Sequence, residues 1–389
     1  MPWNETSVMN QKAQFIADYL SESFTVVELC ETYNISRKTA YKWIDRYLTF
    51  GPGGLEEFSR KPLRSPRKFE PYIEQAIIEI RKKHPTWGPK KLLPYLEKRF
   101  PNTKLPAKTT VCDILKRNNL IPKKRHRRPN KHPGKPIVQM NQPNQTWCAD
   151  FKGQFRTLNG VYCYPLTITD GYSRFILACK ALDSTGLDQT KAVFKGIFRK
   201  FGIPSFILTD NGTPFASCSL GRLTRLSMWW IELGITPVLI QPGNPQQNGR
   251  HERMHKTLKQ ETTIPPAYHL RTQQRKFNSF IQEFNFERPH EALDQQTPSQ
   301  FYQESLIEYP KKIESFVYPD RFETRRVSLN AGIKWRSSWV NVSKVLADKI
   351  IGLEEIDYGK WHVYFNHVRI GILDERLMLI HDSFGQLRR

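Results

Sequence analysis

The alternation of hydrophobic and polar positions divides the chain into segments with different periods. Over residues 8–50 and 70–121, apolar residues recur every three or four positions, which is typical of amphipathic helices. Over residues 141–260, short apolar runs with strand character alternate with helical periods, which predicts a mixed α/β domain. Beyond residue 315, short apolar runs follow one another closely, which predicts a small all-β domain.

The first helical segment has the pattern of a DNA-binding module. Its predicted helices span residues 11–20, 25–33 and 37–47, and Ser36 is placed to cap the third. Two short helices joined by a tight turn resemble a helix-turn-helix, whose recognition helix would be 37–47. A three-helix domain that does not bind DNA is the alternative. The basic residues expected to contact DNA from this helix are Arg37, Lys38 and Lys42.

Two basic, proline-containing stretches flank the second helical segment. They span residues 51–69 and 122–140, and neither has the apolar residues to build a core. Such stretches can lie along phosphates or in a minor groove, and solvated linkers are the alternative. The residues expected to contact DNA here are Arg60, Lys61, Arg64, Lys123, Lys124, Arg125, Arg127 and Arg128.

The charge of the chain favours a polyanionic partner. The 389 residues include 60 Lys and Arg against 37 Asp and Glu, a formal charge of +23. Nucleic acid is the expected partner, and an anionic membrane surface is the less favoured one. No apolar stretch is long enough to span a bilayer and no signal-peptide pattern is present, so a cytoplasmic protein is expected. The six cysteines have no CxxC spacing, so we expect reduced thiols and no structural zinc.

Three carboxylates in the mixed segment are candidates for one metal-binding site. Asp150 and Asp210 interrupt or end apolar runs with strand character, and a carboxylate at a strand end points into the crevice of an open α/β sheet. Glu252 instead lies in the first turn of a predicted helix over residues 250–261. Three acids can hold one or two hard divalent cations such as Mg²⁺, and a pair of ions supports phosphoryl transfer. Glu232 is a rival third acid, but its surroundings indicate the polar face of a structural helix.

The three acids lie in motifs that follow one another in a specific order. The matching residues are Trp147, Asp150 and Phe151; Thr169, Asp170, Ser173, Arg174 and Phe175; Thr209, Asp210, Asn211 and Gly212; Pro242, Pro245, Gln246, Asn248, Gly249, Glu252, Arg253, Thr257, Leu258 and Lys259; and Asn285, Arg288, Pro289, His290, Ala292, Leu293, Thr297 and Pro298. On these motifs, the chain resembles bacterial insertion-sequence transposases of the DDE type, in the retroviral-integrase superfamily. The resemblance is close over residues 141–302.

The resemblance implies a multidomain protein with two N-terminal all-α helix-turn-helix domains, an α/β core of the ribonuclease-H-like fold and a small C-terminal β-barrel. The second helical segment resembles its counterpart in these transposases around Trp87, Gly88 and Lys91. Whether the barrel binds DNA or only contacts a second subunit stays open. The expected domains are 1–50, 70–121, 141–305 and 315–389, with basic linkers at 51–69 and 122–140.

The same resemblance assigns roles to the acids and to two lysines. Asp150, Asp210 and Glu252 are implied as catalytic residues and as ligands of Mg²⁺, which Mn²⁺ can replace, with two ions expected. On the helix of Glu252, Lys256 and Lys259 share its face, where matching lysines of related integrases hold DNA, and solvated lysines are the alternative. His255 lies on this face too, whereas Glu261 would point away from it.

DNA transposition is the function that the resemblance implies. The protein would bind the terminal inverted repeats of a mobile element, cleave the ends by metal-dependent hydrolysis and join the 3′-hydroxyl ends to target double-stranded DNA. It would act as a homodimer or higher oligomer in a bacterial cytoplasm, associated with the nucleoid when bound to DNA. A catalytically silent, sequence-specific DNA-binding protein and a nuclease that does not join are the competing hypotheses. One spacing departs from the family, because 41 residues separate Asp210 from Glu252, and we expect the extra length at 216–225.

Overall fold

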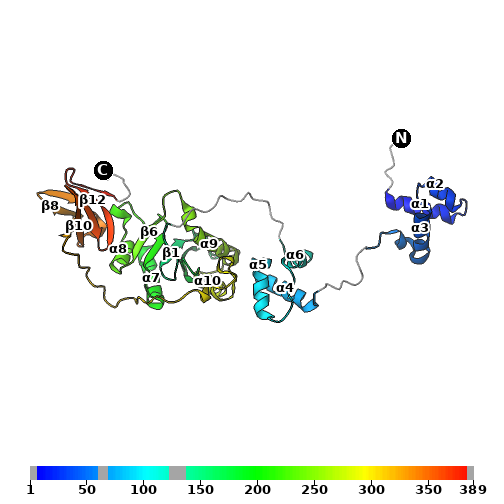
Figure 1. The fold of residues 1–389 in the computed structure, drawn as a ribbon, viewed down its shortest axis with the longest axis horizontal. Coiled ribbons are helices and arrows are strands. Elements are labelled where there is room, and N and C mark those ends of the chain that lie inside the picture. Colours follow the sequence, from blue (N-terminus) through cyan, green and yellow to red (C-terminus); the bar gives the residue numbers. More distant parts are fainter. Residues whose placement is uncertain (1–6, 60–68, 122–136, 383–389) are drawn as a thin grey trace. The chain divides into compact units, whose positions relative to one another are not determined.

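The computed structural model describes residues 7–59, 69–121 and 137–382. Contacts within the chain divide it into two compact units, residues 1–68 and residues 69–389. Figure 1 shows the ribbon, with labels on many of its helices and strands. Within the described residues, no helix combines the length and the apolar character that crossing a membrane requires.

The first unit is a three-helix bundle. Each of its α-helices begins after a hydroxyl N-cap, Ser7, Thr25 or Ser36, whose side chain accepts a backbone N–H of the first turn. The predicted cap at Ser36 is therefore confirmed. The elements are α1 (Val8–Leu20), α2 (Val26–Thr32), α3 (Arg37–Phe50) and the 3-10 helix η1 (Gly51–Leu55).

The core of this first bundle is small and aromatic. Phe15, Leu29 and Trp43 are buried in one cluster, with one residue from each helix. Val27 is exposed, because α2 turns Leu29 and Cys30 toward the core. The burial of one face leaves the opposite face of α3 in solvent.

A second helical bundle opens the second unit. Its helices are α4 (Pro71–Lys83), α5 (Pro89–Arg99) and α6 (Lys108–Arg117), as the helical periodicity of residues 70–121 predicts. Ile77, Leu92, Leu96 and Val111 are fully buried in its core together with Trp87 from the turn between α4 and α5. The turn residue is thus part of the packing of the bundle.

One mixed sheet forms the centre of the second unit. Its strands are β1 (Thr146–Phe151), β2 (Phe155–Arg156), β3 (Tyr162–Asp170), β4 (Ile176–Leu182), β5 (Phe206–Thr209) and β6 (Thr236–Leu239). They lie in the order β2-β3-β1-β5-β6, and β4 pairs with β3. β1 pairs antiparallel with β3 and parallel with β5, so the antiparallel and parallel parts of the sheet meet at β1.

Four main helices complete this α/β core. They are α7 (Leu187–Phe201), α8 (Arg225–Glu232), α9 (Gly249–Thr262) and α10 (Leu270–Gln282), and α10 continues into the single π-turn η4 (Glu283–Glu287). Strand residues share one hydrophobic cluster with α7 and α8 and a separate cluster with α9 and α10. The prediction of a mixed α/β domain is confirmed. In this domain, α9 packs beside the sheet.

The C-terminal residues fold into two antiparallel sheets. The larger sheet has the order β13-β12-β11-β10-β7, and the smaller is the hairpin β8-β9. The strands are β7 (Glu323–Arg326), β8 (Gly332–Trp335), β9 (Ser338–Asn341), β10 (Ile350–Asp357), β11 (Lys360–Phe365), β12 (Val368–Asp374) and β13 (Leu379–Asp382).

The expected β-barrel is not confirmed, because both sheets are open. Among the described residues, no strand pairing joins the hairpin to the larger sheet or closes the larger sheet on itself. Trp335 and Val340 of the hairpin instead share one buried cluster with Leu353 and Val363 of the larger sheet. Side-chain packing between two faces therefore replaces the closing hydrogen bonds of a barrel.

Candidate active site at the ends of β1 and β5

Parallel strand pairing brings two of the predicted acids together. Ala149 of β1 is in register with Thr209 of β5. The residues that come next along each strand, Asp150 and Asp210, are therefore neighbours across the two strands. Asp210 begins the turn after β5, where its Oδ1 accepts the Gly212 N–H at 3.1 Å. The two carboxylates thus occupy the carboxyl ends of adjacent strands, the edge at which open α/β sheets bind ligands.

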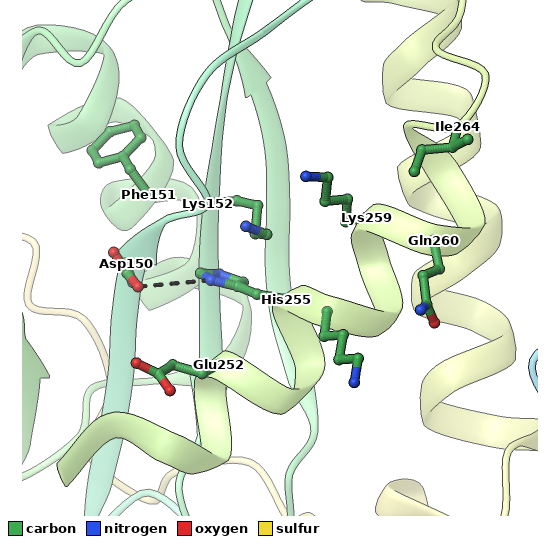
Figure 2. Close-up of a pocket in the computed structure, with 9 residues that line it drawn as sticks. Asp150, Phe151, Lys152, Glu252, His255, Lys259, Gln260 and Ile264 are labelled. Carbon is green, nitrogen blue, oxygen red and sulfur yellow. Dashed lines mark ion pairs between the residues drawn. The ribbon is translucent and has the colours of Figure 1, made fainter. Parts of the chain in front are cut away.

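The third predicted acid reaches the same place from a helix. Glu252 lies in the first turn of α9 and is exposed. A pocket of about 570 Å³ is lined by both Asp150 and Glu252. Figure 2 shows Asp150 on its strand and Glu252 on the helix, with both carboxylates turned toward the same space. Further along α9, the lining includes His255, Lys256 and Lys259.

The electrostatics of Asp150 indicate that acids are crowded here. Burial and then the neighbouring Asp210 raise the pKa of Asp150 to about 7, and Glu252 adds to this rise. The Phe151 N–H and the Lys152 ammonium act in the opposite direction and only partly offset the rise. Asp210 and Glu252 thus both lie close enough to Asp150 to raise its pKa, although Asp210 does not line the pocket itself.

These carboxylates fit a hard divalent cation. Their donor atoms are all oxygens, which Mg²⁺ and Mn²⁺ accept. A cation would also remove the repulsion that raises the Asp150 pKa, because its charge favours the ionised acid. The residues that could hold it are Asp150, Asp210 and Glu252.

Two buried histidines offer a different set of possible ligands beside Asp150. Asp150, His251 and His255 each place one ligand atom within 4.8 Å of the others. However, the Thr167 hydroxyl oxygen lies 2.7 Å from His251 Nε2 and 2.6 Å from His255 Nε2. Both Nε2 atoms are therefore already hydrogen-bonded to Thr167, and Thr169 bonds the other nitrogen of His251 at 2.9 Å. We interpret the histidines as a hydrogen-bonded support.

The two histidines are neutral, and His255 and Thr167 both lie next to Asp150. Burial lowers the pKa of His251 to about 3 and, together with His251, lowers that of His255 further. His255 Nδ1 lies 3.7 Å from Asp150 Oδ2, and the Thr167 hydroxyl also lies 3.0 Å from the Asp150 carbonyl oxygen. In β3, Thr167 stands opposite Asp150 in register, which explains how one hydroxyl meets both groups.

Other acids near the motifs have structural partners. Asp170 is buried and accepts hydrogen bonds from the Asn144 N–H and from the Ser173 N–H and hydroxyl, so it closes the turn after β3. Glu232 pairs with Lys349 at 2.6 Å, as expected of a helix surface. Glu261 pairs with Arg288 at 2.7 Å and does not line the pocket, in agreement with its predicted direction.

The expected DNA-contacting residues fall into three groups. Arg37, Lys38 and Lys42 are exposed on α3. Lys38 and Lys42 lie on the side opposite its buried face, whereas Arg37 lies in the first turn on the side of Ala40 and Ile44. Lys256 and Lys259 are exposed on α9 and line the pocket of Glu252, where the helical spacing placed them. The remaining residues, Arg60, Lys61, Arg64, Lys123, Lys124, Arg125, Arg127 and Arg128, lie outside the described residues.

Sequence reasoning missed several residues around the site. Lys152, Gln260 and Ile264 line the pocket, and His251 hydrogen-bonds Thr167 beside it. The inward side of α9 carries His251, Met254, His255, Leu258 and Thr262, all of them buried. This spacing of three and four residues could have identified both histidines as inward-facing, because Met254 and Leu258 mark that stripe as apolar.

Two kinds of known domain match the chain. Integrase core domain families match residues 140–245 and 233–298, which cover the mixed sheet, α9 and α10. Homeodomain-like domain families match residues 11–56 and 39–115 in the helical part. These matches support DNA-binding helical modules ahead of a ribonuclease-H-like core.

Individual proteins are similar over the core. An uncharacterised protein of insertion element IS136 from Agrobacterium fabrum is 30% identical over 188 residues, which are 45% of this chain and 90% of that protein. The Pol polyprotein of Radiation murine leukemia virus is 32% identical over 126 residues, 32% of this chain and 20% of that polyprotein. A solved structure of the HTLV-2 integrase catalytic core domain in complex with magnesium has 16% identity and a TM-score of 0.34, covering 42% of this chain and all of that one.

Proposed function

Because the chain belongs to the DDE-type insertion-sequence transposases of the retroviral-integrase superfamily, we propose that it moves a DNA element by end cleavage and strand transfer. It binds the terminal inverted repeats, cleaves the element's ends by metal-dependent hydrolysis and joins the 3′-hydroxyl ends to target DNA. The observation that carries this proposal is the pairing of β1 with β5, which sets Asp150 beside Asp210. Glu252 lines the pocket of Asp150.

In this proposal the three acids are metal ligands. Asp150, Asp210 and Glu252 would together hold the Mg²⁺ ions. Ions bound there would supply the positive charge that activates an attacking oxygen and stabilises a leaving oxygen in phosphoryl transfer. The protein itself contributes position and charge, which dominate catalysis of phosphoryl transfer.

The cationic side chains around the pocket suit a phosphate backbone. Lys152, Lys256 and Lys259 line the pocket together with the acids. In the proposed complex, the α9 lysines hold phosphates of the element's end, which orients the scissile bond toward Asp150 and Glu252. Thr167 bonds the backbone carbonyl of Asp150, and His255 lies 3.7 Å from its carboxylate, so both restrict where Asp150 can stand.

A strand-transfer assay tests this function. A labelled DNA duplex that ends in the terminal repeat is incubated with supercoiled target and Mg²⁺, and both nicked ends and joined products are measured. A transposase gives both products. A nuclease gives only nicked ends, and a catalytically silent DNA-binding protein gives neither, although it still retards the labelled end. A homodimer or higher oligomer on DNA is part of the proposal, and sizing of the DNA complex tests it.

A further inference from the structure

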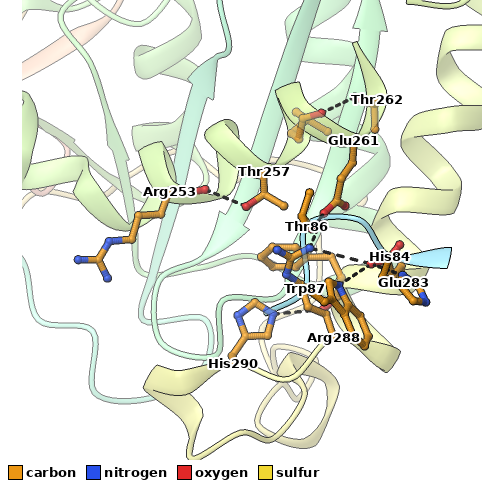
Figure 3. Close-up of polar contacts among 12 residues, drawn as sticks. His84, Thr86, Trp87, Arg253, Thr257, Glu261, Thr262, Glu283, Arg288 and His290 are labelled. Carbon is orange, nitrogen blue, oxygen red and sulfur yellow. Dashed lines mark hydrogen bonds and ion pairs between the residues drawn. The ribbon is translucent and has the colours of Figure 1, made fainter. Parts of the chain in front are cut away.

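The turn between α4 and α5 makes polar contacts with the end of α9 and with the π-turn η4. Trp87 donates its indole N–H to Glu283 Oε1 at 3.1 Å, and Thr86 donates its hydroxyl to Glu261 Oε1. His84 Nδ1 lies 3.0 Å from the same oxygen of Glu283. Figure 3 shows these side chains gathered around the two carboxylates. We call Glu261 and Glu283 the acidic socket.

The turn that enters the acidic socket is fixed by the packing of its own bundle. Trp87 is fully buried and stacks on His84, with ring centroids 4.1 Å apart. Tyr95 of α5 meets the Trp87 ring edge-on, and Arg81 of α4 donates to the Trp87 carbonyl. Because this turn cannot move without disturbing the bundle core, a contact made by the turn positions the whole bundle.

Arg288 completes the acidic socket from the side of the α/β core. Its guanidinium lies 2.7 Å from Glu261 and 4.0 Å from Glu283, and its side chain is only 6% exposed. Oε1 of Glu261 therefore accepts one donor from the core and one hydroxyl, that of Thr86, from the bundle. Charges removed from water are tolerated only with good partners, and the bundle supplies several of them here.

The charges across this contact are complementary. Burial and then Arg288 lower the pKa of Lys91 to about 8, whereas Glu261, Glu283 and Glu291 favour its charged form. Burial tends to raise the pKa of Glu283, but His84, Arg288 and Trp87 outweigh it, so the pKa is lowered. Around this buried centre lie more exposed ion pairs, Lys90 with Glu291 and Lys83 with Glu287. The exposed ion pairs form a polar rim around this buried centre, as at the edge of many protein interfaces.

We propose that the acidic socket is a docking site that holds the α4–α6 bundle on the α/β core of the same chain, and that it positions bundle-bound DNA relative to Glu252. Glu261 and Glu252 lie on one helix, nine residues and about 13 Å apart along its axis. The socket thus fixes one end of the rigid element whose other end carries the proposed metal ligand. The docking itself does not depend on the proposed function, whereas the effect on DNA rests on it.

The docking contact includes the first turn of α5. This turn carries Lys90 and Lys91, whose charges are directed toward acids of the core. The first turn of α6 carries Lys108 and Thr109, which are both exposed, and Lys108 also helps to lower the pKa of Glu291.

Docking is measured first, without DNA. Lys90→Cys and Glu291→Cys place thiols at the exposed rim, in a background with Cys112→Ser and Cys218→Ser, and a short bis-maleimide joins them when the bundle is docked. Thr86→Val with Trp87→Phe removes the Thr86 and Trp87 donors, leaves the His84 contact and should slow crosslinking by roughly tenfold. Glu287→Gln is the matched control, because its contact with Lys83 is exposed and 3.8 Å long. Equal crosslinking in all three chains, or none in the parent, overturns the docking.

Two measurements guard against a folding defect. Thr86→Val alone leaves the bundle core and the Arg288–Glu261 pair intact, and it should slow crosslinking in the same direction. Thermal unfolding of each variant identifies chains that have lost the bundle. A slow rate in a chain with normal unfolding supports the socket, and an unchanged rate in Thr86→Val with Trp87→Phe contradicts it.

Positioning is measured next, on end cleavage at saturating DNA. The Thr86→Val, Trp87→Phe chain should cleave roughly tenfold more slowly, with end affinity changed by less than about threefold. The bis-maleimide lock at positions 90 and 291 should restore cleavage, which a general folding defect would not allow. Unchanged cleavage in the undocked chain, or a loss that the lock does not rescue, overturns the positioning role. If the parent chain cleaves no DNA, the proposed function fails, while the crosslinking result still decides the docking.

Discussion

Gly221, in the loop between β5 and α8, lies so close to Ile370 of β12 that an added Cβ would stand 3.2 Å from the Ile370 Cβ. Beside it, Leu220 and Leu223 are buried in the hydrophobic cluster of the C-terminal sheets. This loop is the stretch at which we expected residues beyond the usual family spacing. The segment therefore has a structural use, because it packs the C-terminal sheets against the core near Asp210.

We expect Gly221→Ala to loosen this attachment. Gly221 has a φ of +62°, so alanine adds backbone strain as well as the contact with Ile370, together about 1–3 kcal/mol of unfolding free energy. Gly234→Ala is the matched control, because Gly234 has a φ of +82° but an open Cβ position, and it reports the strain alone. Denaturant unfolding measures both. An equal loss in the two variants would show that the Ile370 contact contributes nothing.

The second prediction concerns the three acids. Asp150→Asn, Asp210→Asn and Glu252→Gln should each lower cleavage and joining by roughly a hundredfold or more, because each removes a proposed metal ligand. Binding of the DNA end should survive, since the helical modules lie elsewhere in the chain. Asp188→Asn, an exposed acid on α7, should behave as the wild type. If one of these three variants cleaves above about a hundredth of the wild-type rate, the residue that it replaces is not part of the active site.

The third prediction is a pH dependence of stability without metal. The folded state binds the Asp150 proton more tightly than the unfolded chain, so stability should fall as pH rises from 3.8 to about 7. Asp150→Asn cannot ionise, so at pH 8 it should be more stable than the wild type by on the order of 4 kcal/mol, and the difference should vanish near pH 4. Saturating Mg²⁺ should remove the difference at pH 8. Thermal unfolding across this range decides it, and a constant difference would argue against a perturbed Asp150.

Particular residues show how much of the site could be predicted from sequence. Asp150 and Asp210 were identifiable because each follows a short apolar strand, and Lys256 and Lys259 because helical spacing relates them to Glu252. The register of Ala149 with Thr209, which makes the two aspartates neighbours, is a long-range pairing that no local pattern specifies. The support by Thr167 also depends on strand register, since its hydroxyl reaches His251 only across the sheet.

The fold was predicted most accurately where periodicity is local. The helices of both bundles and the strands of the core follow their amphipathic patterns closely. The β-barrel was not confirmed, because strand patterns show which residues are inward and do not show whether edges β7 and β13 close. The acidic socket could not be predicted for the same reason. In the sequence, Glu261 and Glu283 resemble ordinary surface acids, and only the folded chain brings the Trp87 turn into contact with them.

The fourth prediction separates specific from general DNA binding. Arg37→Ala, Lys38→Ala and Lys42→Ala should each weaken binding to the terminal repeat, by about 1–3 kcal/mol for a residue that contacts a base, and at least one should relax sequence preference. Deleting residues 123–128 should instead lower affinity for all DNA alike and flatten the salt dependence. Binding curves on repeat and random duplexes test both. Footprints of residues 1–121 without preference for the element's ends would remove the recognition role of α3.

The last prediction concerns Lys259, which lines the same pocket as Asp150 and Glu252 from the exposed side of α9. If it holds a phosphate of the element's end, Lys259→Ala should slow end cleavage with normal folding, and the slope of log affinity against log salt should fall by about one. Lys195→Ala, an exposed lysine on α7, is the matched control and should change neither quantity. Lys259→Cys should also crosslink to the terminal nucleotides through a thiol-reactive DNA end. Cleavage and salt slope equal to those of Lys195→Ala would mean that Lys259 is only a solvated charge, and the pocket would then need another cation to orient the DNA.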